Sequence, residues 1–254
     1  MKIAVIPDVQ AKPGNDFSFL TAIGNYIVAK RPDVIVQIGD FADMPSLSSY
    51  DVGKKSFEGR RYKDDIQASH EAMEALLSPI VAYNERAKAN HKERYTPRRI
   101  LTLGNHEHRI ERATENDAKL DGVLSINDLK YAECGWETYK FLEVVVVNNI
   151  AFSHYFTTGQ MGRPCTSANM MLTKKHMSCI AGHQQGLQLA TSYRADGERL
   201  TGIIAGSCYE HDEAYLGPQG NKHFRGMVML HEVTPEGAFD VMPVSIRYLK
   251  ENYL

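Results

Sequence analysis

Short apolar runs recur along the chain, and most of them end at a glycine or a polar residue. The run at 3–6 stops at Pro7, and the run at 34–38 stops at Gly39. Because these runs lack polar residues at alternate positions, they are typical of β-strands covered on both faces. The predicted strands lie at 3–6, 34–38, 99–103, 144–147, 150–152, 179–181, 203–205, 227–230 and 241–246.

Apolar residues at helical spacing predict helices between the first strands. An apolar stripe over 17–27 follows Asp16, which can cap a helix, and Pro32 ends that helix. A second, highly charged helix is predicted over 107–119. Strands and helices therefore alternate in the first half of the chain, whereas strands dominate the second half. This order indicates an α/β fold.

The segment over 44–98 differs in character from the rest. It begins polar and basic, and an apolar stripe over 66–80 then predicts a helix that Pro79 should kink or split. The segment contains too few large apolar residues to form a core of its own. We therefore predict a single domain over 1–254, in which 44–98 is an insertion or a long crossover.

Composition narrows the class of protein. The chain has 254 residues and a formal net charge of -2, which excludes a globally basic nucleic-acid binder but permits a local basic patch. Its four cysteines are scattered, as expected in a reducing cytoplasm. The first strand begins at once without a signal-peptide pattern, and no apolar run approaches membrane-spanning length. We expect a cytoplasmic protein without a membrane partner.

Polar side chains follow five of the predicted strands, at the point where each strand ends. In open α/β sheets this edge is where binding sites form. Each residue alone has a simpler explanation, such as a turn cap, a buried histidine or a loop acid. Five in the same structural position are hard to explain by turn chemistry. The residues are Asp8, Asp40 with Asp43, Asn105 with His106, His154, and His183.

These residues form motifs that resemble those of a known family. The motifs are Asp8-x-Gln10, Gly39-Asp40-x-x-Asp43, Gly104-Asn105-His106-Glu107, His154 and Gly182-His183-x-Gln185. Their order and spacing resemble the five motifs of the calcineurin-like metallophosphoesterases. The stretches 41–65 and 211–220 further resemble phage-encoded members, which would place the protein in a host cytoplasm.

The resemblance implies a fold and a metal centre. The expected fold is a four-layer α/β/β/α sandwich of two mixed sheets with flanking helices, and the expected cofactor is one or two divalent metal ions. Asp40 would bridge two ions, and Asp8 would serve one of them. Three residues would complete the other ion's coordination, namely Asn105, His154 and His183.

The same resemblance implies the catalytic roles. His106 would protonate the leaving oxygen, and Asp43 would fix its tautomer and raise its basicity. The metal ions would generate a hydroxide near neutral pH and neutralise charge that develops on the phosphate.

Two departures from the family pattern fall on one metal ion. Gln10 and Gln185 stand where the family usually has histidines. Amide oxygens are hard, neutral ligands, so manganese or magnesium should be favoured over zinc or iron. Three hypotheses remain: a retuned two-metal site, a one-metal enzyme, or a decayed site. Decay would not spare one ion's ligands together with the Asp43–His106 pair.

The basic start of the insertion gives a hypothesis about the substrate. Arg60 and Arg61 could contact phosphate groups, and Phe57 and Tyr62 could stack on a base; a solvated surface is the alternative. We therefore expect a phosphate-ester substrate, with nucleic acid as a candidate partner. The predicted reaction is phosphodiester hydrolysis by a nuclease or phosphodiesterase. The alternatives are a phosphomonoesterase acting on nucleotides or phosphoproteins, and a non-catalytic binding scaffold.

Overall fold

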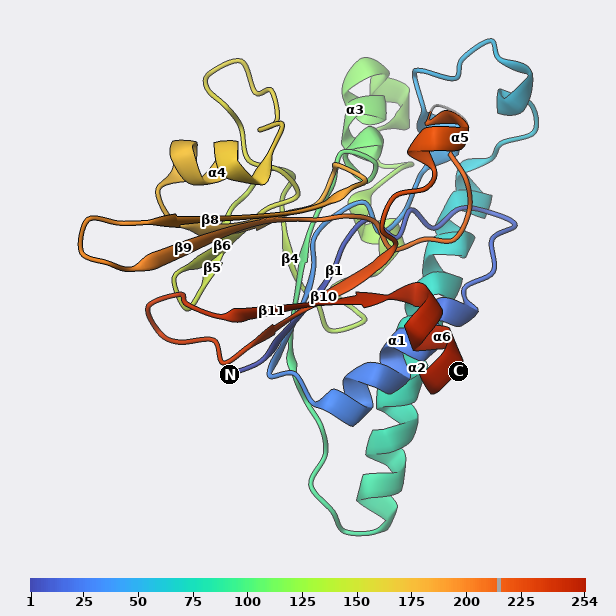
Figure 1. The fold of residues 1–254 in the computed structure, drawn as a ribbon. Helices are drawn as coiled ribbons and strands as arrows, with labels where there is room; N and C mark the ends of the chain where they lie inside the picture. The colour runs from blue at the N-terminus through green and yellow to red at the C-terminus, as the bar shows by residue number, and fades with distance from the viewer. Residues whose placement is uncertain (214–215) are drawn as a thin grey trace.

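The computed structural model describes residues 1–213 and 216–254, and two mixed β-sheets lie face to face in it (Figure 1). Within the described residues, the first sheet contains, in spatial order, β11 (Asp240–Ser245), β10 (Gly226–His231), β1 (Ile3–Ile6), β2 (Val34–Gln37), β3 (Arg98–Thr102) and β4 (Glu137–Tyr139). The second contains β5 (Val145–Val147), β6 (Ile150–Phe152), β7 (Ser178–Ala181), β9 (Arg199–Ala205) and β8 (Leu187–Tyr193). Strands β1 to β4 run parallel, as do β6, β7 and β9.

Alternate side chains of the central strands pack into different cores. In β1, Ile3 and Val5 pack against the second sheet, whereas Ala4 and Ile6 pack against helices on the outer face. Because both faces are covered, every residue of β1 and β2 is buried. The predicted four-layer sandwich of two mixed sheets with flanking helices is therefore confirmed.

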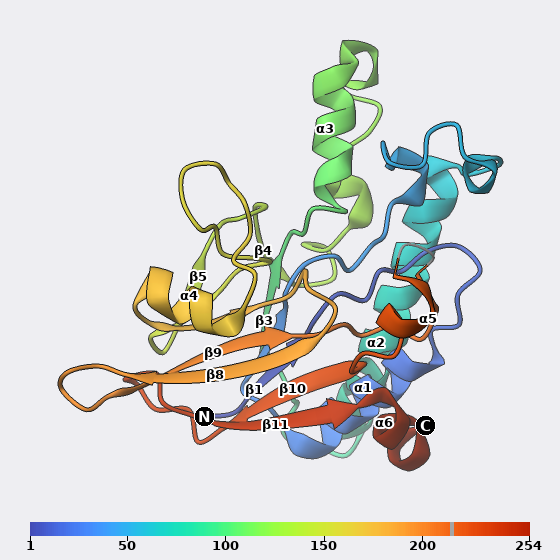
Figure 2. The same ribbon diagram turned by 45° about the horizontal axis from the view of Figure 1, so that its top comes forward.

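Helices form the two outer layers (Figure 2). The first sheet is covered by α1 (Ser18–Lys30), α2 (Tyr62–Ala89) and α6 (Ile246–Tyr253), and the second by α4 (Ala168–Lys175). The helices α3 (His108–Asn116) and α5 (Gly217–Gly220) lie at the upper end of Figure 1, and short 3₁₀ helices span Pro45–Leu47, Lys55–Phe57, Ala118–Leu120 and Ile126–Leu129. Among the helices of the described residues, none is both long and apolar enough to cross a membrane.

The predicted splitting of the long helix at Pro79 is wrong. Helix α2 runs through Pro79 and reaches Ala89, which is beyond the predicted end at residue 80. A proline inside a helix costs about 3 kcal/mol or more. Burial of Leu76 and Ile80 against α1 and the first sheet offsets this cost, since each large apolar side chain contributes about 1.5–3 kcal/mol.

The C-terminal segment also differs from the prediction. Strand β11 ends at Ser245, and Ile246 begins α6, whereas the sequence predicted a strand over 241–246. The Ser245 side chain caps α6, because its Oγ accepts a hydrogen bond from the Tyr248 backbone N–H at 3.2 Å. The sequence analysis also missed β4, β8 and α4.

Candidate metal centre

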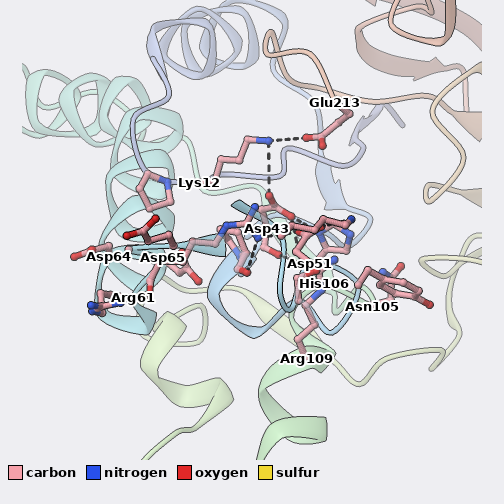
Figure 3. Close-up of a pocket in the computed structure, with 18 of the residues that line it drawn as sticks. Lys12, Asp43, Asp51, Arg61, Asp64, Asp65, Asn105, His106, Arg109 and Glu213 are labelled. Atoms are coloured by element: carbon pink, nitrogen blue, oxygen red, sulfur yellow. Dashed lines mark hydrogen bonds and ion pairs between the residues drawn. The ribbon is translucent and has the colours of Figure 1, made fainter. Parts of the chain in front are cut away.

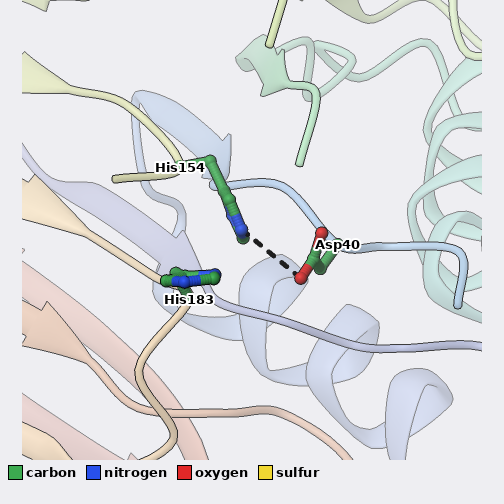
Figure 4. A group of neighbouring side chains, drawn as sticks. All are labelled: Asp40, His154 and His183. Carbon is green, nitrogen blue, oxygen red and sulfur yellow. Dashed lines mark ion pairs between the residues drawn. The ribbon is translucent and has the colours of Figure 1, made fainter. Parts of the chain in front are cut away.

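The five predicted strand ends meet between the two sheets. Asp8 and Asp40 follow β1 and β2 of the first sheet, whereas His154 and His183 follow β6 and β7 of the second. Ligand atoms of Asp40, His154 and His183 all lie within 4.8 Å of one another (Figure 4). The fold therefore brings together residues that are up to 143 positions apart, as is expected of a metal site at a sheet edge.

Asp40 lies at the middle of this cluster and is almost wholly buried. Its Oδ2 lies 3.3 Å from His154 Nε2, and its Oδ1 accepts a hydrogen bond from the His106 backbone N–H at 2.9 Å. Burial opposes ionisation of Asp40, but the two histidines outweigh it and hold the pKa of Asp40 below its ordinary value. Asp40 is therefore a carboxylate ready to accept a cation.

The ring of His154 is fixed at both nitrogens. Nδ1 faces the Ile38 carbonyl oxygen at 3.0 Å, and Nε2 faces Asn105 Oδ1 at 2.9 Å. Burial opposes the charged ring, but the carboxylates of Asp40 and Asp8 raise the pKa of His154 to about 9. A backbone carbonyl on Nδ1 is the usual way in which a protein directs the Nε2 atom of a histidine at a metal ion.

His183 completes the cluster, and its pKa is shifted in the opposite direction from that of His154. Burial, followed by the nearby His154, lowers the pKa of His183 to about 4, so its ring is neutral near pH 7. A neutral imidazole is the form that ligates a metal ion. Its backbone N–H donates to Asp8 Oδ1 at 3.1 Å, which ties the two sheets together at this point.

Asp8 and the two glutamines form the other half of the predicted site. Asp8 is fully buried, and burial, with a smaller contribution from Asp40, raises the pKa of Asp8 to about 7. Among the described residues, neither Asp8 Oδ2 nor Gln10 Oε1 has a hydrogen-bond partner, although both atoms are buried. Gln185 differs from Gln10, because its Oε1 accepts a hydrogen bond from the Tyr209 hydroxyl at 2.7 Å.

Two glycines make room for the carboxylates. A Cβ atom on Gly104 would lie 2.0 Å from Asp40 Oδ1, and one on Gly182 would lie 2.3 Å from Asp8 Oδ1. Any side chain at these positions would therefore displace the two acids.

The residues present fit a divalent cation. Buried polar atoms normally have partners, so the unpartnered oxygens of Asp8 and Gln10 point to a bound ligand, although Asp8 lies outside the group formed by Asp40, His154 and His183. The available donors are carboxylate and amide oxygens together with imidazole nitrogens, a set that suits hard to borderline metal ions.

His106 and Asp43 form a pair beside the cluster. His106 Nδ1 lies 2.7 Å from Asp43 Oδ1, so the two side chains form an ion pair when the ring is protonated. Burial opposes protonation of His106, but Asp40 and Asp43 outweigh it and raise the pKa of His106. Arg109 Nη1 and Lys12 Nζ lie 3.5 and 3.8 Å from the Asp43 carboxylate.

Glu107 is a residue of this site to which the sequence analysis gave no role. It is fully buried, and its carboxylate accepts hydrogen bonds from the backbone N–H groups of Asp40, Ala42 and Gly104 at 3.0, 2.9 and 2.8 Å. Burial, followed by Asp40, raises the pKa of Glu107. Glu107 thereby joins the loops after β2 and β3, and its place directly after His106 was the only signal in the sequence.

A pocket of about 880 Å³ opens beside the cluster (Figure 3). Its walls include Asn105, His106 and His183 at the metal centre, and Arg60 and Arg61 from the insertion. The guanidinium of Arg60 is held by Asp51 at 2.8 Å and by the Pro45 carbonyl at 3.0 Å, whereas Arg61 is exposed. The segment 45–65 therefore forms one wall of the pocket.

Lys12 and Glu213 also line this pocket, and the sequence analysis gave neither a role. Lys12 Nζ lies 2.7 Å from Glu213 Oε1, and the same carboxylate oxygen lies 2.7 Å from His211 Nε2. His211 and Glu213 lie in the stretch 211–220 that resembled phage-encoded members, and no local pattern in the sequence pairs Glu213 with Lys12.

Comparisons with known proteins agree with this geometry. The calcineurin-like phosphoesterase family model matches residues 1–184, a stretch that contains all five strand ends. The Gene 54 protein of Mycobacterium phage L5 is 37% identical to this chain over 79 residues. That alignment covers 31% of this chain and 29% of the phage protein, so the chain matches less than a third of this relative's length.

Proposed function

The chain belongs to the calcineurin-like phosphoesterase family, and on that premise we propose that it hydrolyses phosphodiesters, as a nuclease or phosphodiesterase. Family membership supports a metal-dependent hydrolase that acts on phosphoester bonds. One observation carries the proposal of catalysis: the His106–Asp43 pair lies beside the Asp40, His154 and His183 cluster, and His183 lines the same pocket as the pair.

The proposed ligands divide into two groups. Asp40, Asn105, His154 and His183 would hold one divalent cation, and Asp8 with Gln10 would hold a second next to Asp40. The oxygen-rich second group supports manganese as the preferred ion. When bound, divalent cations offset the charge of the phosphate and make water a stronger acid at neutral pH.

His106 supplies the proton in this proposal. Its Nδ1 faces Asp43, which leaves Nε2 directed toward the metal centre, 3.7 Å from Asp40 Oδ2. A phosphate at the centre would then meet Nε2, and the raised pKa of His106 favours a ring that carries a proton there. Nε2 gives this proton to the leaving oxygen, and Asp43 keeps the ring oriented.

The charges around His106 support a diester over a monoester. A phosphomonoester carries more negative charge near neutral pH, which additional unpaired cations would have to neutralise. Lys12 is held by Glu213 at 2.7 Å, and Arg109 is held by the Asp43 carboxylate and its backbone carbonyl. The pocket also extends along the insertion, where a second ester group fits and where Arg60 and Arg61 are candidates for phosphate contacts.

The test is metal-dependent turnover of matched substrates. Metal-stripped protein receives manganese, magnesium or zinc, and hydrolysis of bis(4-nitrophenyl) phosphate is compared with that of 4-nitrophenyl phosphate. His106→Ala should lower kcat for the diester by about 10²-fold or more, the usual scale for a general acid. His108→Ala, two residues along the same segment, is the matched control and should stay near the wild-type rate.

Each alternative gives a distinct result. Higher kcat/KM for the monoester would replace the proposal with a phosphomonoesterase. Metal binding without turnover of either ester, or equal rates for His106→Ala and wild type, would favour the non-catalytic scaffold.

A further inference from the structure

Tyr50 is 81% exposed, although it lies on the wall of the pocket that contains His106. An aromatic ring in solvent beside a catalytic centre offers a face on which another ring can stack. We propose that Tyr50 stacks on a base of the substrate, so that the pocket takes a nucleoside attached to the scissile phosphate. This inference rests on the proposed function, because it names the substrate class of the same site.

The loop that carries Tyr50 is anchored on both sides. Ser48 is buried, and the carboxylate of Asp51 lies 2.8 Å from both Lys54 Nζ and Arg60 Nη1. Arg60 Nη1 also donates to the Pro45 carbonyl oxygen at 3.0 Å. An exposed ring on a fixed backbone loses little conformational entropy when a ligand stacks on it, which favours binding.

The other aromatic residues of the segment 44–65, Phe57 and Tyr62, already have partners. The guanidinium of Arg60 lies 5.5 Å from the centre of the Phe57 ring, and the Tyr62 hydroxyl donates to Asp128 Oδ2 at 2.7 Å. Phe57 and Tyr62, the two rings that the sequence analysis considered for stacking, are thus partly buried and in contact with other side chains of the protein. Tyr50 is the aromatic residue of the described segment 44–65 whose ring remains in solvent.

The size and charge of the pocket limit what can bind there. Its volume of about 880 Å³ is within the range of sites for small organic ligands. Among the described residues, six carboxylate side chains and five lysines or arginines line it. A long polyanion would need an excess of positive charge along its path, whereas a nucleoside beside a single phosphate would not.

The experiment removes the ring from the enzyme and the base from the substrate. Thymidylyl-(3′→5′)-thymidine is compared with two analogues in which one or the other thymine is missing from its sugar. We expect Tyr50→Ala to lower kcat/KM for the full dinucleotide roughly tenfold, the scale of one base–aromatic stack. For one of the two abasic analogues the effect should be much smaller, because the stack has already been lost.

Variants separate stacking from a structural role. Tyr50→Phe keeps the ring and should keep the rate, and Tyr193→Ala, which removes a 70% exposed tyrosine from β8, is the matched control. Equal effects of Tyr50→Ala on all three substrates, or no effect, would overturn the inference. If no substrate reacts, the proposed function fails, and binding of thymidine 3′- and 5′-monophosphate decides instead. Weaker binding by Tyr50→Ala supports the stack, and unchanged binding overturns it.

Discussion

The backbone N–H of Asp40 donates a hydrogen bond to the buried carboxylate of Glu107 at 3.0 Å. The same carboxylate accepts hydrogen bonds from the Gly104 and Ala42 N–H groups, so one side chain joins the loops after β2 and β3. Asp40 belongs to the cluster with His154 and His183. Its position therefore depends on Glu107, a residue that would not touch the metal ion.

Glu107→Gln tests this dependence. Both oxygens of the Glu107 carboxylate accept hydrogen bonds from backbone N–H groups. In glutamine one of these oxygens is replaced by an NH₂ group, which cannot accept, so at least one hydrogen bond is lost and two donors face each other. We expect manganese affinity to fall about 10- to 100-fold, as for other residues that orient metal ligands. Isothermal titration calorimetry of metal-stripped protein measures this change. Glu111→Gln, on the exposed side of α3, is the control, and equal affinities for the two variants would contradict the assigned role.

Gly104→Ala tests the close approach of β3 to Asp40. The added Cβ would lie 2.0 Å from Asp40 Oδ1 and 2.3 Å from its backbone nitrogen, so the loop must shift. Overpacking of this kind costs about 1–3 kcal/mol, and here it also moves a proposed ligand. We expect a lower Tm together with weaker metal binding. Gly159→Ala, where no atom lies within 4 Å of the added Cβ, should change neither quantity.

The strands that position the site could be predicted from the sequence because they are buried on both faces. The runs before Asp8, Asp40 and Asn105 are mainly apolar, with Gln37 and Thr102 as single polar exceptions, and the polar residues that follow them are therefore conspicuous. That all five strand ends converge also followed from the family resemblance, and the structure brings Asp40, His154 and His183 together.

The elements and site residues that the sequence analysis missed depend on contacts between distant parts of the chain, which a local sequence pattern does not show. Strand β8 was missed because its residues are half-buried or exposed. Strand β4, Glu137–Tyr139, was missed because it is likewise exposed or half-buried and forms no apolar run. The role of Glu107 depends on backbone groups 65 and 67 positions away. Tyr50 is distinguished from Phe57 and Tyr62 by its exposure and by the contacts of those two rings, which are properties of the folded chain.

Gln10→His tests why this chain departs from the family pattern. Gln10 Oε1 is buried without a hydrogen-bond partner among the described residues, so we interpret it as a hard oxygen ligand. An imidazole nitrogen at this position should raise the affinity for zinc relative to manganese. Competition between the two ions, followed by native mass spectrometry, measures the preference. Gln67→His on the exposed face of α2 is the control, and an unchanged zinc-to-manganese ratio in Gln10→His would refute this role.

Tyr26→Phe tests the pH dependence of stability away from the metal centre. Tyr26 is fully buried, its hydroxyl has no hydrogen-bond partner among the described residues, and burial raises its pKa from 10.0 to about 12. The unfolded chain therefore ionises first as the pH rises. The stability that Tyr26 contributes is complete below pH 10 and is lost as the pH rises from 10 toward 12. One such group changes the free energy of unfolding by up to about 1.4 kcal/mol per pH unit.

Phenylalanine removes this titration together with an unsatisfied hydroxyl. Tyr26→Phe should be at least as stable as wild type at neutral pH, because no hydrogen bond is lost. Above pH 10 its free energy of unfolding should fall less steeply, although Tyr62 and Tyr95, whose pKa values are also raised, keep some dependence. Urea unfolding across this pH range measures the difference. Tyr193→Phe, at an exposed position, should follow the wild-type curve, and a Tyr26→Phe curve that also follows it would show that burial of this hydroxyl has no effect on alkaline stability.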